Sequence, residues 1–115
     1  NDYAALVERF KRHFAGFLRG ETGVTGLCQE LLVFDGNYLR RLIRMTLDAY
    51  CYQTSGINAA GEAIGEADNE RARQLLDLRL RAQNQLRTEE NNLDFQLQLE
   101  DVLISLKQIL TRRLI

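Results

Sequence analysis

The 115-residue sequence predicts an all-α fold, a bundle of four or five helices with long C-terminal helices, and three observations support this prediction. The chain contains no proline, the residue that most strongly interrupts helices. Residues 66–115 contain no glycine and are rich in Glu, Gln, Arg, Leu and Ala, which favour helices. Apolar residues recur three and four positions apart, as on the buried face of a helix. We predict one domain, residues 1–115, with helices at about 2–19, 25–34, 37–54, 59–87 and 89–114.

The first predicted helix, residues 2–19, carries a seam of large apolar side chains. Asp2 precedes the seam and suits an N-cap position, and the spacings within the seam are typical of a helix: Tyr3, Val7, Phe10, Phe14 and Phe17. Three phenylalanines make an apolar surface that other helices must cover. The glycine-rich segment 20–26 that follows lacks both the Gly-Lys-Ser/Thr of a phosphate-binding loop and a preceding strand, so we predict a connecting loop.

The next two predicted helices, 25–34 and 37–54, are separated by Asp35-Gly36-Asn37, three residues typical of turns and helix starts. The second of these helices has an apolar stripe consisting of Leu39, Leu42, Ile43, Thr46, Ala49 and Tyr50. Arg40, Arg41 and Arg44 cluster on its other side, with Tyr38 nearby. Asp48 follows Arg44 by four positions, a spacing that predicts a local ion pair.

The start of the fourth predicted helix has two interpretations. Small residues at every fourth position allow close approach of another helix backbone, and they favour a start near residue 59: Ala59, Ala63 and Ala67. Gly61 and Gly65 lie between them, and each glycine inside a helix costs about 1 kcal/mol. The helix therefore begins either at residue 59, capped by Asn58, or later, near Glu66.

The long C-terminal half must also bend. An unbroken helix from Ala59 to Ile115 would be roughly 85 Å long, whereas a globule of this length is about 30 Å across. We predict a turn near Thr88–Asn92, within a polar stretch where Thr88 could cap a new helix.

Residues 93–100 alternate apolar and polar side chains, which is typical of a strand with one buried face. We prefer a helix, because helical spacing continues through the next ten residues and the chain offers no second strand for pairing. On a helix these apolar residues form two stripes: Leu86, Leu93, Leu97 and Ile104 on one side, and Phe95, Leu99, Val102, Leu106, Ile109 and Leu110 on the other. A helix with two apolar sides lies between two partners. Together with the phenylalanine seam and the small residues at 59–67, these stripes exceed what a minimal three-helix bundle buries. A four- or five-helix bundle could absorb this surplus, but we expect self-association or an obligate protein partner.

The composition gives little support to catalysis, and we expect no enzyme, metal or cofactor. The only histidine, His13, lies beside the phenylalanine seam without a nearby nucleophile, and with Cys28 and Cys51 it matches no zinc spacing. No apolar run has the length of a membrane span. Net charge is −1, which disfavours nucleic acid as a partner. No signal peptide is visible, and two cysteines read as unpaired favour a cytoplasmic location.

We therefore expect a non-enzymatic protein–protein interaction module, such as a scaffold, adaptor, chaperone-like or regulatory bundle, that acts through helix packing. The candidate interaction residues are Tyr38, Arg40, Arg41, Arg44, Phe95, Leu99 and Leu106. One alternative is a bundle that senses a small ligand in an apolar cavity lined by Tyr50 or Tyr52. Another is a nucleic-acid-associated protein that uses the patch of Arg40, Arg41 and Arg44.

Overall fold

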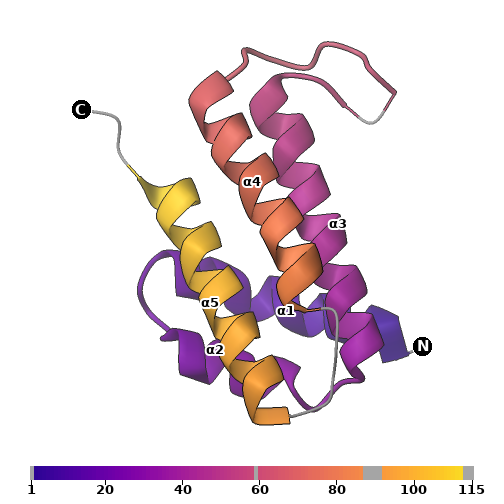
Figure 1. Cartoon of the computed structure of the whole chain (residues 1–115), viewed down its shortest axis with the longest axis vertical. Helices are drawn as coiled ribbons and strands as arrows, with labels where there is room; N and C mark the ends of the chain where they lie inside the picture. The colour runs from indigo at the N-terminus through magenta and orange to yellow at the C-terminus, as the bar shows by residue number, and fades with distance from the viewer. Residues whose placement is uncertain (1, 59, 87–91, 113–115) are drawn as a thin grey trace.

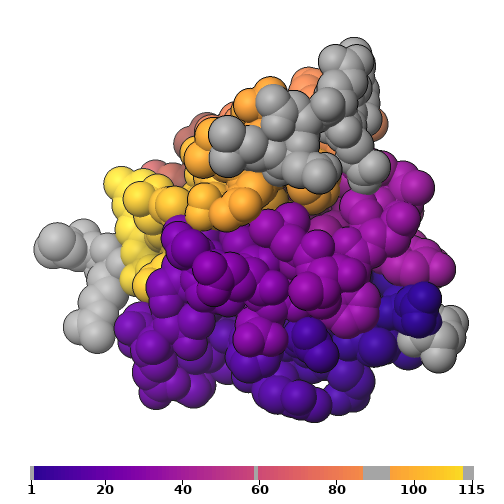
Figure 2. Space-filling view, turned by 90° about the horizontal axis from the view of Figure 1, so that it is seen from below, coloured from indigo at the N-terminus to yellow at the C-terminus, as the bar shows by residue number. Residues whose placement is uncertain are grey.

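The computed structural model describes residues 2–58, 60–86 and 92–112, and within these ranges the chain forms five helices and no strand. The helices are α1 (Asp2–Leu18), α2 (Val24–Leu31), α3 (Gly36–Ser55), α4 (Asn69–Gln85) and α5 (Asn92–Thr111). The predicted all-α bundle is confirmed. Helices α3, α4 and α5 run side by side with alternating directions, and α1 crosses them at one end (Figure 1). Seen from that end, α1 and the beginning of α5 lie on opposite sides of the molecule (Figure 2).

One apolar core joins all five helices. Helix α1 contributes Leu6, Phe10, Phe14 and Phe17, all buried. The rings of Phe10 and Phe14 stack with centroids 4.6 Å apart, and those of Phe14 and Phe17 are 6.1 Å apart. The predicted seam therefore lies inside the bundle, covered by the helices that α1 contacts, namely α2, α3 and α5.

The turn between α2 and α3 lies at Asp35-Gly36-Asn37, where the sequence predicted a turn and a helix start. Asp35 is the N-cap of α3, and its Oδ1 accepts a hydrogen bond from the backbone N–H of Asn37 at 2.8 Å. This bond satisfies one of the amide groups that a helix start leaves without a partner. At its other end, α3 stops at Gly56, which has φ +76°.

The fourth predicted helix does not begin at residue 59, because polar side chains hold the preceding segment in a loop. The Asn58 Oδ1 accepts hydrogen bonds from the backbone N–H groups of Ala60 and Glu62, both at 3.0 Å. These local bonds compete with the helical pattern, and Gly61 adopts φ +81°. Asp68 then caps α4 by accepting a hydrogen bond from the backbone N–H of Arg71. The predicted start near Glu66 is therefore closer to the observed start at Asn69 than residue 59 is.

This loop also changes the predicted helix lengths. Helix α4 has 17 residues, the same as α1, whereas α3 and α5 have 20 each. Of the two C-terminal helices, only α5 is among the longest. The predicted turn at Thr88–Asn92 falls mainly on residues 87–91, which lie outside the described residues, while Asn92 is the first residue of α5.

The alternating segment 93–100 is helical, as preferred, and its two apolar stripes meet different surroundings. Phe95, Leu99 and Leu106 are buried in the core. Leu97 and Ile104 are 54% and 40% exposed on the outer side of α5. The alternation therefore reflects a helix with one buried side and one partly exposed side, rather than a strand. Leu86, predicted on the same stripe as Leu97, instead lies at the C-cap of α4 and is 3% exposed.

The loop after α3 returns so closely to the helix end that only a glycine fits at position 56. The N–H of Ile64 donates to the Gly56 carbonyl at 2.8 Å, and the N–H of Asp68 donates to the Thr54 carbonyl at 2.7 Å. A Cβ atom at position 56 would lie 2.5 Å from the carbonyl oxygen of Gly65. Both the left-handed backbone and this contact therefore require glycine.

We predict that Gly56→Ala lowers the free energy of unfolding by more than about 2 kcal/mol, because it adds a steric overlap to the cost of a left-handed alanine. The matched control is Gly61→Ala, where φ is +81° but no atom lies within 4 Å of the new Cβ. This control should cost only the left-handed backbone term, about 1 kcal/mol. Urea unfolding followed by circular dichroism measures both, and equal losses would contradict the close approach.

A second prediction concerns α5. Phe95→Asp places a carboxylate where the native ring is 6% exposed, so we expect a loss of stability of at least about 3 kcal/mol. Leu97→Asp, on the exposed stripe of the same helix, should stay within about 0.5 kcal/mol of the wild type. Urea unfolding provides the measurement, and a Phe95→Asp protein of unchanged stability would disprove the burial of this ring.

Candidate functional site

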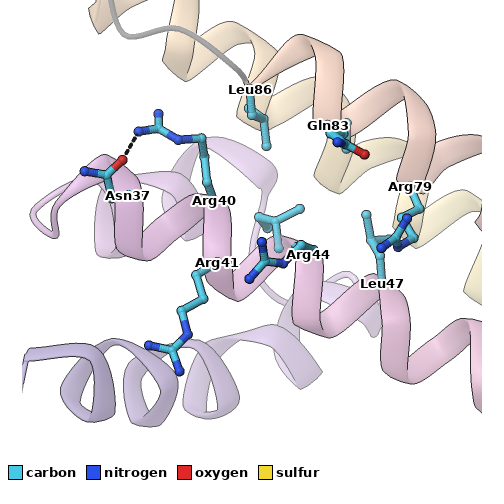
Figure 3. Close-up of a pocket in the computed structure, with 10 residues that line it drawn as sticks. Asn37, Arg40, Arg41, Arg44, Leu47, Arg79, Gln83 and Leu86 are labelled. Carbon is cyan, nitrogen blue, oxygen red and sulfur yellow. Dashed lines mark hydrogen bonds between the residues drawn. The ribbon is translucent and has the colours of Figure 1, made fainter. Parts of the chain in front are cut away.

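A cleft of about 610 Å³ opens between α3 and α4 (Figure 3). Four arginines line it, Arg40, Arg41 and Arg44 from α3 and Arg79 from α4. The remaining lining residues are the apolar Ile43, Leu47, Ala82 and Leu86 and the amides Asn37 and Gln83. The cleft therefore combines several positive charges with an apolar base.

Helix geometry explains how these groups meet. Arg40 and Arg44 are four residues apart on α3, and Arg79 and Gln83 are four residues apart on α4, so each pair occupies one face of its helix. Because α3 and α4 pack side by side in opposite directions (Figure 1), the two faces meet along one seam. The sequence predicted the cluster of arginines on α3, whereas the contribution of Arg79 to the cleft depends on the packing of α4 against α3.

Asp48 pairs across this seam rather than along its own helix. The Arg79 Nε donates a hydrogen bond to Asp48 Oδ1, and this bond and the negative charge of Asp48 raise the pKa of Arg79. The predicted local pair between Arg44 and Asp48 does not form. Arg44 is exposed and makes no hydrogen bond or ion pair with any residue in the described ranges.

The other two arginines of α3 point in different directions (Figure 3). Arg40 is half-buried, donates a hydrogen bond to the Asn37 Oδ1, and has its guanidinium carbon 5.8 Å from the centre of the Phe95 ring. Arg41 turns toward α1, where its guanidinium carbon lies 4.3 Å from the centre of the Tyr3 ring. Arg44 is therefore the cleft arginine that is best placed to receive a ligand.

Among the described residues, none that lines the cleft is acidic. Two described carboxylates contact lining residues: Asp48 pairs with Arg79, and Asp35 accepts a hydrogen bond from the backbone N–H of Asn37. A guanidinium group presents a planar fork of donors that matches a carboxylate or a phosphate. The arrangement is therefore suited to binding an anion.

The structure separates the predicted interaction residues into two groups. Arg40, Arg41 and Arg44 come together at the cleft, and Tyr38 lies near them but packs edge-on against Tyr3 with ring centroids 5.9 Å apart. In contrast, the predicted apolar contacts Phe95, Leu99 and Leu106 are 6%, 0% and 1% exposed. These three residues fill the core of the chain itself, so they do not form a surface for a partner.

Other predicted features lie elsewhere. Tyr50 and Tyr52, the candidates for lining a ligand cavity, are not among the residues that line the cleft. His13 lies 3.8 Å from Glu30, which also approaches Arg9. In the described part of the chain, no three His, Cys, Asp or Glu side chains converge as metal ligands would, and none of its helices has the length and apolar character needed to cross a bilayer.

No family model matches this chain, and neither a curated protein nor a solved structure matches it.

Both cysteines are free thiols in different surroundings. Cys28 is buried in the core, where burial and the nearby charge of Glu100 raise its pKa to about 12. Cys51 is half-buried, and burial together with Asp48 raises its pKa, while Arg79 opposes this effect. Because the thiolate is the nucleophile, Cys28 should be inert in the folded protein.

We predict that iodoacetamide at pH 8 modifies Cys28 at least about 100-fold more slowly in the native protein than in urea, because burial suppresses both access and the thiolate. Peptide mass spectrometry after timed quenching measures each cysteine separately. Cys51 provides the internal comparison and should react faster than Cys28 in the native state. Equal rates for Cys28 in the native and unfolded states would contradict its position in the core.

Proposed function

We propose that this chain is a non-enzymatic protein-interaction module whose arginine-lined cleft between α3 and α4 binds an acidic segment of a partner protein. The observation that carries the proposal is the exposed Arg44, which has no ion-pair partner in the described residues, within a cleft lined by three further arginines. A partner carboxylate would supply the missing counter-charge.

The shape of the cleft favours such a contact over an ordinary surface ion pair. Fully exposed pairs contribute only about 0–1 kcal/mol, because water and salt screen them. Here the apolar side chains of Ile43, Leu47 and Leu86 lie beside the guanidinium groups. These three side chains are at most 3% exposed, so they exclude water from beneath the guanidinium groups, and a carboxylate bound there is screened less than on an open surface.

Charge favours an acidic protein segment over nucleic acid. Nucleic-acid binding gains its strength from several phosphates neutralised along a positive surface. The net charge of this chain is −1, and the clustered arginines occupy one cleft between two helices. One or two carboxylates match this small positive site better than an extended polyanion does.

A small amphiphilic anion is the second candidate ligand. The cleft volume of about 610 Å³ lies in the range of about 300–1,000 Å³ that small-molecule sites occupy. The guanidinium groups suit the carboxylate of such an acid, and the methylene stems of the arginines offer apolar contact to its body. This alternative predicts saturable binding of a small acid that an acidic peptide does not displace.

We predict that Arg44→Glu weakens the binding of a fluorescein-labelled octaglutamate peptide by about tenfold, because it replaces an attraction with a repulsion inside the cleft. Fluorescence anisotropy at 50 mM salt gives the dissociation constants. Arg12→Glu is the matched control, since it makes the same change of charge at an exposed position of α1 outside the cleft lining. This control should weaken binding by less than about twofold.

Three outcomes would overturn the proposal. One is the absence of octaglutamate binding by the wild-type protein, and another is an equal loss in Arg44→Glu and Arg12→Glu, which would indicate only a general charge effect. The third is a single-stranded oligonucleotide that binds more tightly than octaglutamate and depends on Arg44, because this would favour the nucleic-acid alternative. Thermal unfolding of both variants establishes that they remain folded.

A further inference from the structure

Large apolar side chains remain exposed on the outer faces of α4 and α5. Leu76 and Leu80 of α4 are 48% and 51% exposed, and Leu97 and Ile104 of α5 are 54% and 40% exposed. The two pairs are chemically similar but differ in their surroundings. Only the pair on α4 belongs to the helix that lines the arginine cleft.

Leu76 and Leu80 continue the cleft along α4. Leu76 precedes Arg79 by three residues, and Leu80 precedes Gln83 by three residues. Side chains three and four positions apart share one face of a helix, and both Arg79 and Gln83 line the cleft. The two leucines therefore lie next to the cleft rather than on the opposite side of α4.

Tyr52 extends this apolar area onto α3. The ion pair between Arg79 and Asp48 fixes the two helices at one level. From this pair, Leu76 lies about one turn toward the start of α4, and Tyr52 lies about one turn toward the end of α3. Because the helices run in opposite directions (Figure 1), the end of α3 lies beside the start of α4. Leu76 and Tyr52 are therefore both displaced from the ion pair toward that same end. Tyr52 is 41% exposed and close enough to Arg79 to influence it electrostatically.

We propose that Leu76, Leu80 and Tyr52, which we name the apolar shelf, bind an apolar side chain of the same partner segment whose carboxylate enters the arginine cleft. This inference rests on the proposed function and makes it more specific. The partner segment would then be recognised by an acidic residue and an apolar residue at a fixed separation, and not by acidity alone.

Helix geometry gives the expected separation between the acidic residue and the apolar residue of the partner segment. Arg44 and Tyr52 are eight residues apart on α3, which corresponds to roughly 12 Å along the helix axis. An extended peptide advances about 3.3 Å per residue, so it covers this distance in about four residues. The carboxylate and the apolar side chain should therefore be about four positions apart in an extended partner segment.

The experiment compares two labelled peptides by fluorescence anisotropy. One contains four glutamates, a Gly-Ser-Gly spacer and two leucines, and the other has two serines in place of the leucines. Each peptide is made in both chain directions, because the structure does not prescribe the direction of the segment. With the wild-type protein, we expect the leucine peptide in its better direction to bind about tenfold more tightly than the serine peptide.

Two double variants locate the source of this gain. Leu76→Ser with Leu80→Ser should reduce the gain to less than about twofold, while binding of the serine peptide stays unchanged. Leu97→Ser with Ile104→Ser is the matched control, because it removes two leucine-sized side chains of similar exposure on α5. This control should keep the tenfold gain.

The possible failures are distinguishable. If neither peptide binds, the proposed function fails and the inference fails with it. If both peptides bind equally well, or both double variants lose the gain equally, the shelf proposal is wrong while the acidic cleft stands. If light scattering shows a wild-type dimer that Leu76→Ser with Leu80→Ser converts to a folded monomer, a second copy of the chain covers the shelf, and this result also overturns the inference.

Discussion

The antiparallel packing of α3 against α4 is the constraint on which the rest of the structure depends. On its inner side, this packing contributes Leu39, Leu47, Leu75 and Leu78 to the core shared with the other helices. On its outer side, the same packing forms the cleft and brings Arg79 to the arginines of α3. The chain can reverse between the two helices because Gly56 accepts both a left-handed backbone and the close approach of Gly65.

Local features of the fold could be predicted from the sequence, because they depend on neighbouring residues. The phenylalanine seam of α1 and the Asp35 cap of α3 follow from spacing and side-chain chemistry alone. The start of α4 was harder to predict. There, alanine spacing favoured a helix, whereas Asn58 offered the backbone an alternative set of hydrogen bonds that the loop adopts.

The candidate site shows a similar division. The clustering of Arg40, Arg41 and Arg44 follows from their positions on one helix, and the structure places all three at the cleft. Periodicity also separated the two apolar stripes of α5 but gave no means of deciding which of them faces the core. The packing buries Phe95 and Leu99 and leaves Leu97 and Ile104 exposed. No local signal marked Arg79, because its place in the site depends on contacts between distant segments.

The pairing of Asp48 explains how an almost neutral chain produces a positive cleft. A local pair between Arg44 and Asp48 would contribute about 0.3–0.5 kcal/mol as an exposed contact within one helix. The pair with Arg79 joins two helices instead, in a position where both side chains are about one-third exposed, and partial burial reduces the screening by water. Asp48 thereby serves the packing of α3 against α4 and leaves Arg44 without a counter-charge in the described residues. The ion pair that links α3 to α4 across the seam is thus also the reason that Arg44 is available for the acidic ligand proposed above.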